Sequence, residues 1–232
     1  MNTSSFNPIP HDTPIFIVGG GELYPKDLDA LRNMAGPIYA ADSGADRVLA
    51  ARLPLQGVIG DFDSISNDTR QTIPQAQQFP SSDQNSTDFE KSLGLLRAPI
   101  IHAIGFTGAR LDHQLAVLNG LVKFPSQRVI VWGDHDVICI CPPKLDLALP
   151  VGCRISLFPM GQVRGQSTGL RWPIGGLAFT PDGQIGTSNI TDRATQSLQF
   201  TAPLMLLCLP RDHLWHLAAA LSSAPHWPVH AK

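Results

Sequence analysis

The sequence predicts an α/β domain built on a parallel sheet, followed by an all-β domain of short antiparallel strands. Up to Pro142, apolar runs that end at Gly or Asp alternate with stretches whose apolar residues recur at spacings of three and four, which is typical of strands alternating with helices. Beyond Pro150 the helical spacing stops, and short apolar runs are separated by Gly, Pro and Asp. At 232 residues, of which 43% are hydrophobic, the chain is long enough for one large domain or two smaller ones.

Expected strands and helices alternate along the first half. The run PIFIV stops at three glycines and predicts a buried strand over residues 15–18, whereas Leu28, Leu31 and Ala35 lie on one face of a helix over residues 25–35. The other stretches that contain strands, with the loops that follow them, are 37–45, 57–63, 99–106 and 128–134. The other expected helices are 45–53, 88–97 and 111–124.

The second half is expected to form an antiparallel sandwich or barrel. Its short apolar runs occupy residues 154–160, 169–174, 176–179, 184–190, 197–200 and 204–209. We place the domain boundary within residues 141–152, where Pro is frequent. The predicted organisation is a disordered lead-in over 1–14, an α/β domain over 15–145 and a β domain over 146–232.

Composition argues against several classes of protein. A formal net charge of -2 and the lack of a Lys/Arg run argue against binding to nucleic acid. No apolar run is long enough for a transmembrane helix, and the N-terminus lacks the features of a signal peptide, so we expect no membrane association. The four cysteines show no zinc spacing and are interpreted as free thiols in a reducing cytoplasm.

Acidic residues gather in two stretches, GDFDSI at 60–65 and SSDQNSTDFEK at 81–91. Asp61 and Asp63 would face the same side of the chain if the backbone stays extended. Thr87 can cap the following helix, with Glu90 completing a capping box, which would place Asp88 in the first turn near the positive end of the helix dipole. Three converging carboxylates need a cation, and oxygen ligands suit Mg²⁺, which often bridges carboxylates and substrate phosphates. The alternative is that these acids only cap turns and helices.

Four polar, Gly-rich loops follow expected strands: GGG, ADSG, GDFD and GFTGARLDH. Ligands of open α/β sheets bind at the carboxyl ends of the strands, so these loops are expected to converge on one crevice. Gly19–Gly21 would let backbone N–H groups approach a phosphate chain, although no P-loop or dinucleotide fingerprint is present. Arg110 offers a forked donor suited to phosphate, with a structural salt bridge as the alternative.

The combined motifs resemble those of the thiamine pyrophosphokinase family. They are, in order, ADSGADRVL, GDFDSI, DQNSTDFEKSL, TGARLDHQLAVLNGL, TGLRWPI and GTSNI, and the match runs from Ile15 to Leu209. This resemblance implies an N-terminal Rossmann-like domain, a C-terminal β-sandwich and a homodimer with active sites at the subunit interface. It also implies a cytoplasmic transferase that uses Mg²⁺ to move pyrophosphate from ATP to the hydroxyethyl oxygen of thiamine, giving thiamine diphosphate and AMP.

The resemblance also implies roles for individual residues, by their positions in the motifs. The expected catalytic residues are Asp61, Asp63, Asp88 and Arg110, of which the three acids would bind magnesium. The expected ATP-binding residues are Gly20, Gly21, Asp42, Thr87, Arg110, Asp112 and His113. The expected thiamine-binding residues are Gln84, Trp172, Ser188 and Asn189, with the Trp172 indole stacking on or attracting a thiamine ring.

Three other functions stay open at this point. A pyrophosphokinase for another small alcohol, such as a hydroxymethylpterin, would not need Trp172 together with Ser188 and Asn189. A nucleotide- or thiamine-binding module without catalysis would not need so many acids in one place. A metal-dependent phosphohydrolase would need a base that positions water, and the sequence does not identify one.

Overall fold

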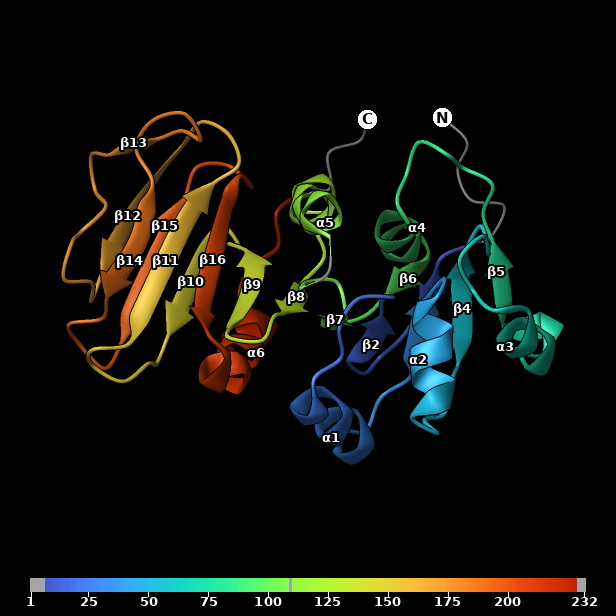
Figure 1. Cartoon of the computed structure of the whole chain (residues 1–232). Helices are drawn as coiled ribbons and strands as arrows, with labels where there is room; N and C mark the ends of the chain where they lie inside the picture. The colour runs from blue at the N-terminus through green and yellow to red at the C-terminus, as the bar shows by residue number, and fades with distance from the viewer. Residues whose placement is uncertain (1–6, 109, 229–232) are drawn as a thin grey trace. The chain divides into compact units, whose positions relative to one another are not determined.

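The computed structural model describes residues 7–108 and 110–228. They fold into two compact units, whose helices and strands are labelled in Figure 1. The first unit extends to Gly120 and also contains Val131–Asp134. The second unit comprises Leu121–Ile130 and the chain from His135 onward.

The first unit alternates strands and helices, as expected. Its elements are β1 (Ile9–Pro10), β2 (Ile15–Val18), α1 (Pro25–Asn33), β3 (Ile38–Ala41), α2 (Gly44–Ala50), β4 (Gly57–Gly60), α3 (Asn67–Thr72), the short 3₁₀ helix η1 (Gln75–Gln77), β5 (Gln78–Pro80), α4 (Asp88–Leu95), β6 (Leu96–Arg97), β7 (Ile101–Ile104) and α5 (Leu111–Lys123). Strand β8 (Val129–Trp132) links the two units along the chain.

A parallel sheet in the order β7-β2-β3-β4-β5 forms the centre of the first unit, which confirms the predicted parallel sheet. Every residue of β2, β3, β4 and β7 is buried. Both faces of the sheet are therefore covered, because a face in water would show alternating exposed residues. Helix α2 packs against β2 and β3, and α4 packs against β3 and β4.

The strand order places a switch point at the carboxyl end of β2. Strands β2, β3, β4 and β5 proceed in chain order toward one edge, whereas β7 pairs with the other side of β2. The loops after β2, β3 and β7 therefore diverge from one place, which is where open α/β sheets bind ligands.

The predicted disordered lead-in is wrong for residues 9–11. Strand β1 pairs in parallel with β6, and His11 Nε2 lies 3.0 Å from the Tyr39 hydroxyl. The pairing satisfies backbone groups of the Pro-rich segment that the sequence suggested would stay solvated. The lead-in residues 1–6 lie outside the described residues.

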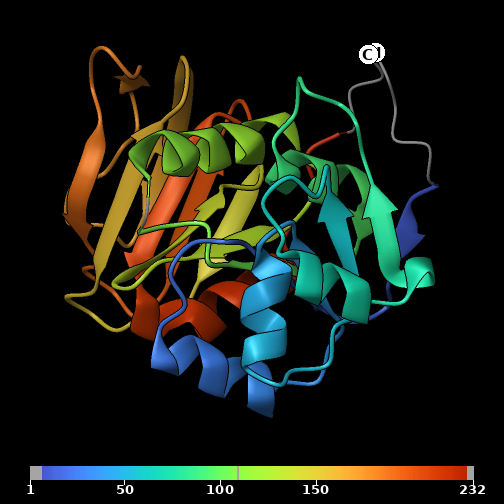
Figure 2. The same cartoon turned by 45° about the vertical axis from the view of Figure 1, so that its right-hand side comes forward.

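The second unit contains two antiparallel sheets, which confirms the predicted change of architecture. After β9 (Asp136–Ile140) it contains β10 (Lys144–Leu147), β11 (Arg154–Pro159), β12 (Val163–Thr168), β13 (Ala178–Phe179), β14 (Gly186–Ile190), β15 (Gln196–Phe200), β16 (Met205–Pro210), the 3₁₀ helix η2 (Arg211–His213) and α6 (Leu214–Ser223). One sheet is ordered β14-β11-β16-β9 and the other β10-β15-β12-β13, and Figures 1 and 2 show one lying over the other. Leu145, Leu198, Ile155 and Leu207, two from each sheet, are fully buried.

The position of the boundary differs from the prediction. Strand β9 pairs antiparallel with β16, and β10 pairs antiparallel with β15, so the stretch 141–152 lies inside the second unit. The run VICIC has no period that distinguishes a buried parallel strand from a buried antiparallel one. Only its pairing partner assigns it to the β unit.

Three further elements differ from the sequence prediction. Residues 169–174, expected as a strand, form a loop joined to the sheet by a single bridge between Leu170 and Thr191. Strand β12 is polar, and it forms by pairing with β15 and β13. Helix α6 was not expected.

Among residues 7–108 and 110–228, no helix has the length and apolar character needed to cross a membrane.

Candidate active site

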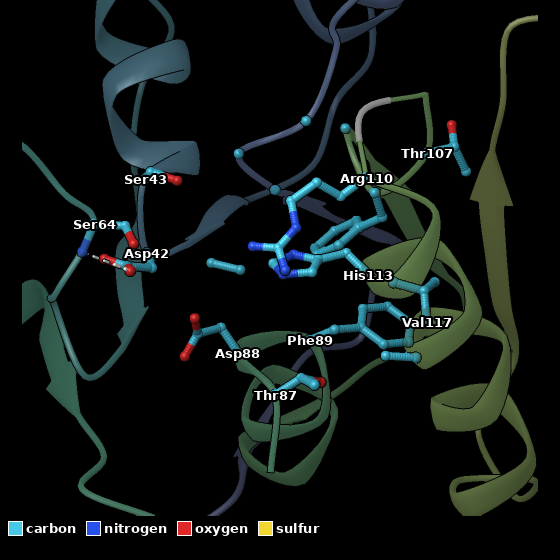
Figure 3. A pocket seen from close by; sticks show the side chains of 17 residues that line it. Asp42, Ser43, Ser64, Thr87, Asp88, Phe89, Thr107, Arg110, His113 and Val117 are labelled. Atoms are coloured by element: carbon cyan, nitrogen blue, oxygen red, sulfur yellow. Dashed lines mark hydrogen bonds between the residues drawn. The ribbon is translucent and has the colours of Figure 1, made fainter. Parts of the chain in front are cut away.

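A cavity of about 410 Å³ lies at the carboxyl ends of β2, β3 and β7, at the switch point (Figure 3). Its size suits a small-molecule ligand. The lining residues come from five segments: Gly19–Gly21, Ala41–Ser43 with Ser64, Thr87–Phe89, Gly105–Thr107, and Arg110, His113, Ala116 and Val117 around the start of α5. Three of the four predicted loops, those after β2, β3 and β7, thus line one cavity. The fourth loop, GDFDSI, contributes Ser64.

The three glycines after β2 allow two loops to pack closely. A Cβ atom at Gly19 or Gly21 would lie 2.6 Å from the Gly105 carbonyl oxygen, so neither position accepts a side chain. The N–H groups of Gly19 and Gly21 donate to the carbonyls of Ile104 and Gly105, both at 2.8 Å. Among the described residues, Gly20 alone of the three keeps its N–H unbonded. The N–H available to an anion is therefore that of Gly20.

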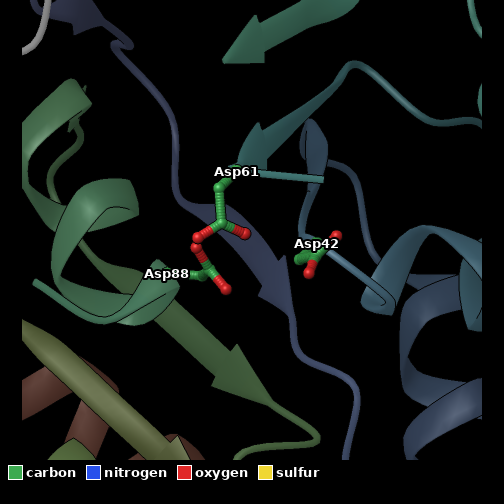
Figure 4. A group of neighbouring side chains, drawn as sticks. All are labelled: Asp42, Asp61 and Asp88. Atoms are coloured by element: carbon green, nitrogen blue, oxygen red, sulfur yellow. The ribbon is translucent and has the colours of Figure 1, made fainter. Parts of the chain in front are cut away.

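Two of the lining residues, Asp42 and Asp88, form a cluster of three carboxylates with Asp61: each offers an oxygen within 4.8 Å of the other two (Figure 4). Asp42 follows β3, Asp61 follows β4, and Asp88 begins α4. The Asp88 backbone is positioned by the predicted capping box, because Thr87 Oγ1 accepts from the Glu90 N–H at 3.2 Å and Glu90 Oε2 accepts from the Thr87 N–H at 3.3 Å. We call these three residues the acid cluster.

Asp42 holds the GDFDSI loop as well as belonging to the acid cluster. It is 3% exposed, and its two carboxylate oxygens accept from the N–H groups of Ser64 and Ile65, both at 3.1 Å. Burial, the neighbouring carboxyl of Asp63 and the charge of Asp88 raise the pKa of Asp42 to about 6. Its backbone has a φ of 44°, a left-handed conformation that is uncommon for non-glycine residues.

Asp63 does not belong to the acid cluster, although the sequence predicted it as a metal ligand. The prediction required an extended backbone from Asp61 to Asp63, but Phe62 between them has a φ of 63° and turns the chain. Asp63 instead lies beside Asp42 and is exposed, with its Oδ1 accepting from the Ser64 hydroxyl at 2.8 Å. The structure thus brings Asp42 to the position predicted for Asp63.

Lys91 binds two members of the acid cluster. Its Nζ lies 2.8 Å from Asp88 Oδ1 and 3.2 Å from Asp61 Oδ2. Burial alone would raise the pKa of Asp61, but Lys91 holds it below its ordinary value, whereas burial outweighs Lys91 and raises the pKa of Asp88. Asp61 Oδ1 is buried and has no hydrogen-bond partner among the described residues. Gln84 Nε2 contacts the other oxygen, Asp61 Oδ2, at 3.4 Å.

The far side of the cavity from the acid cluster is apolar. The rings of Phe89 and Phe106 lie 4.9 Å apart, and Ala116 and Val117 of α5 border the same region. Figure 3 shows Asp42 and Asp88 on one side of the cavity and Phe89 with Val117 on the other. The cavity therefore combines a charged end with an aromatic end, which suits a ligand made of an anionic chain and a planar ring.

Comparison with known proteins agrees with this arrangement. The family model described as thiamin pyrophosphokinase, catalytic domain, matches residues 28–132, which contain the whole acid cluster. This stretch of the chain is therefore similar to the catalytic domain of thiamin pyrophosphokinases. Thiamine pyrophosphokinase 1 of Oryza sativa subsp. japonica is 26% identical over 83% of this chain and 87% of its own length. Thiamine pyrophosphokinase 3 of the same plant is 26% identical over 77% of this chain and 79% of its own length.

The fold is also similar to that of a solved thiamin pyrophosphokinase. The crystal structure of thiamin pyrophosphokinase from Geobacillus thermodenitrificans superposes with a TM-score of 0.72. It is 24% identical and covers 85% of this chain and 97% of its own.

Arg110 and Asp112 form an exposed fork-shaped pair at the edge of the cavity. Arg110 Nε donates to Asp112 Oδ1 at 3.1 Å, and Arg110 Nη2 donates to Asp112 Oδ2 at 2.6 Å. The guanidinium is thus paired with Asp112 while it also lines the cavity beside His113. Both readings of Arg110 from the sequence, a phosphate donor and a salt bridge, fit this geometry.

The predicted thiamine residues of the second unit form a local arrangement of their own. The Trp172 indole is 51% exposed, so it does not belong to the core, and the Arg171 guanidinium lies 5.0 Å from its ring centre. Asn189 is buried and holds the Trp172 backbone: its Oδ1 accepts from the Trp172 N–H at 3.2 Å, and its Nδ2 donates to the Trp172 carbonyl at 2.7 Å. Ser188 is exposed and has a φ of 60°. Asn189 thus positions the loop that presents Trp172.

Two features were absent from the sequence prediction of the site. Lys91 follows Asp88 by three residues on a helix, and this spacing places the two side chains on one face, so it was open to prediction. The contact between Phe89 and Phe106 joins α4 to the loop after β7, and no local pattern indicates it.

Proposed function

We propose that this chain is a thiamine pyrophosphokinase, which transfers the terminal diphosphate of ATP to the hydroxyethyl oxygen of thiamine. In this reaction the hydroxyl oxygen forms a bond to the β-phosphorus of ATP, and the bond from that phosphorus to the oxygen shared with the α-phosphate breaks. The products are thiamine diphosphate, AMP and a proton. The observation that carries the proposal is the cavity at the switch point, with the acid cluster at one end and Phe89 and Phe106 at the other.

The acid cluster fits a magnesium ion. Asp61 Oδ1 is a buried carboxylate oxygen without a partner among the described residues, which is costly unless a cation accompanies it. The three residues offer only oxygen ligands, which Mg²⁺ prefers. We therefore assign the metal to Asp42, Asp61 and Asp88, with Asp63 beside them. A bound Mg²⁺ would supply charge neutralisation for the phosphate oxygens.

The residues of the chain supply binding and orientation for the nucleotide. The Gly20 N–H and the Arg110 guanidinium are donors at the cavity, suited to phosphate oxygens. Phe89 and Phe106 can pack on the base through their apolar surface. Thr87, Asp112 and His113 complete the nucleotide side. Positioning and electrostatics of this kind provide most of the catalysis in phosphoryl-type transfer.

For thiamine, we assign Gln84 of one subunit and Trp172, Ser188 and Asn189 contributed by the other subunit of a dimer. The exposed indole of Trp172 can stack on the pyrimidine or attract the cationic thiazolium. We further propose a homodimer with active sites at the subunit interface, and a reducing compartment such as the cytoplasm. The four cysteines are free, which supports the compartment. Light scattering that gives a fully active monomer would contradict the dimer.

The decisive experiment is to incubate the protein with ATP, Mg²⁺ and either thiamine or a hydroxymethylpterin, and to identify the products by mass. We expect AMP and thiamine diphosphate, with no product from the pterin. AMP formed only with the pterin, or phosphate released without an alcohol, would refute the proposal. Binding of both substrates with no product would assign the chain as a binding module.

Variants of the acid cluster test the metal assignment. We expect Asp61→Asn and Asp88→Asn each to lower kcat by about 100-fold or more, because each removes a charge that holds the cation. Asp68→Asn is the matched control, since Asp68 is exposed in α3, apart from the acid cluster. Normal turnover in both cluster variants would show that the cluster is not the metal site.

A further inference from the structure

The Lys91 side chain occupies an unusual position for a lysine. It is only 5% exposed, and its Nζ contacts Asp61 and Asp88 of the acid cluster at 3.2 and 2.8 Å. It also lies in the first turns of α4, where the partial positive charge of the helix N-terminus disfavours a cation. Burial and the helix dipole both oppose a positive charge on Lys91. The carboxylates of Asp61 and Asp88 must therefore stabilise this charge.

Lys91 leaves part of the acid cluster available. It binds one oxygen of each partner, Asp61 Oδ2 and Asp88 Oδ1. Asp61 Oδ1 is buried and has no partner among the described residues, and Asp42 approaches from the end of β3. Lys91 therefore neutralises part of the cluster, and oxygens remain for a second cation.

The charges of this group have a clear consequence. With all three acids ionised, the acid cluster and Lys91 together carry two negative charges, which a divalent ion balances. Without Lys91 the cluster would hold a divalent ion more strongly, because no fixed positive charge would repel the ion. The loaded site would then keep a negative charge, which would repel the phosphates of a nucleotide.

We propose that Lys91 is a resident cation that weakens binding of a free divalent ion at the acid cluster and favours binding of the ion together with a nucleoside triphosphate. The inference rests on the proposed function only in taking a triphosphate as the ligand of the cavity. In this role Lys91 is a positioning residue: it holds Asp61 and Asp88 side by side and sets the net charge that the phosphates meet.

The test measures Mn²⁺ binding, since Mn²⁺ takes the same oxygen ligands as Mg²⁺ and the free ion is counted by electron paramagnetic resonance. Titrations are made with and without a non-hydrolysable ATP analogue, and thiamine is omitted. The variants are Lys91→Gln and Lys91→Met, which remove the charge, and Lys91→Arg, which keeps it. Lys144→Gln is the matched control, because Lys144 pairs with Asp146 on the exposed face of β10 in the second unit.

We expect both neutral variants to bind Mn²⁺ alone at least ~10-fold more tightly than the wild type, and the Mn²⁺–analogue complex more weakly. Because Lys91→Arg keeps the positive charge, it should stay within about threefold of the wild type in both titrations, and Lys144→Gln should match the wild type. Unchanged or weaker binding of free Mn²⁺ by the neutral variants would overturn the inference, because Lys91 would then serve packing alone.

The folding of the variants gives a second readout. If removal of Lys91 unfolds the chain, the inference requires Mn²⁺ to restore the fold, since either cation can satisfy the carboxylates. A neutral variant that stays unfolded at saturating Mn²⁺ would also overturn it. Neither readout uses thiamine. A chain that does not transfer diphosphate to thiamine would refute the proposed function, and the Mn²⁺ titrations would still decide the role of Lys91.

Discussion

His102 should make the stability of the protein depend on pH. This histidine lies in β7, beside β2 of the parallel sheet, is 2% exposed, and stacks on Phe16 with ring centres 5.2 Å apart. Trp132 Nε1 donates to His102 Nδ1 at 3.1 Å, so Nδ1 is an acceptor and the proton of the neutral ring is on Nε2. Protonation of Nδ1 would make it a donor that faces the Trp132 N–H, so that two donors would meet at a buried position. Burial accordingly lowers the pKa of His102 from 6.5 to about 4.

The direction and size of the effect follow from this shift. The unfolded chain takes up a proton at His102 below pH 6.5, whereas the folded chain does so only near pH 4. The stabilisation is therefore complete above pH 6.5 and is lost progressively as the pH falls toward 4. Between about pH 7.5 and about pH 5, linkage gives a loss of about 2 kcal/mol in the free energy of unfolding from this one residue.

Urea denaturation of the wild type and of His102→Gln at these two pH values isolates that contribution. Glutamine keeps an acceptor for Trp132 and does not titrate, so the variant should lose about 2 kcal/mol less than the wild type over the interval. His216→Gln, an exposed position on α6, should behave as the wild type. An equal pH dependence in His102→Gln and the wild type would refute the assignment of this effect to His102.

Two further predictions concern packing and substrate. Gly44→Ala should destabilise the folded chain by about 3 kcal/mol, because the added Cβ would lie 2.0 Å from the backbone oxygen of Val18. Gly94→Ala in α4, where the added Cβ meets open space, should stabilise the fold by about 0.5–1 kcal/mol. Thermal unfolding compares the two variants, and equal melting temperatures would contradict the packing at Gly44. Trp172→Ala should raise the KM for thiamine on the order of tenfold, because the variant loses the contact of the indole with a thiamine ring. The melting temperature should not change, because the indole is 51% exposed. A folded variant with normal thiamine kinetics would show that Trp172 does not belong to the thiamine site.

Local patterns were sufficient for the parts of the fold and site that depend on neighbours in the chain. The apolar runs of β2, β3, β4 and β7 predicted buried parallel strands, and the structure has them buried on both faces. The Thr87–Glu90 capping box was likewise predicted, because both partners lie within one helical turn. These features place Asp88 at the start of α4, as the sequence indicated.

The acid cluster shows where local patterns are insufficient. The sequence predicted Asp61 and Asp63 on one side of an extended chain, but the left-handed backbone of Phe62 separates them, and Asp42 is the third member of the cluster. A left-handed phenylalanine has no signature in the sequence, because contacts from elsewhere in the fold must offset its steric cost.

The sequence alone determined the order of parallel and antiparallel halves, the helix cap before Asp88 and the acidic character of the cavity, since each follows from periodicity, capping or composition within a short stretch. The tertiary structure alone decided that β9 joins the β unit, that Lys91 also contacts Asp61, and that Phe89 meets Phe106. The physical reason is the same in each case. Strand pairing, ion pairing and ring packing join residues far apart along the chain, and the energy that selects one partner over another exists only once the elements are packed together.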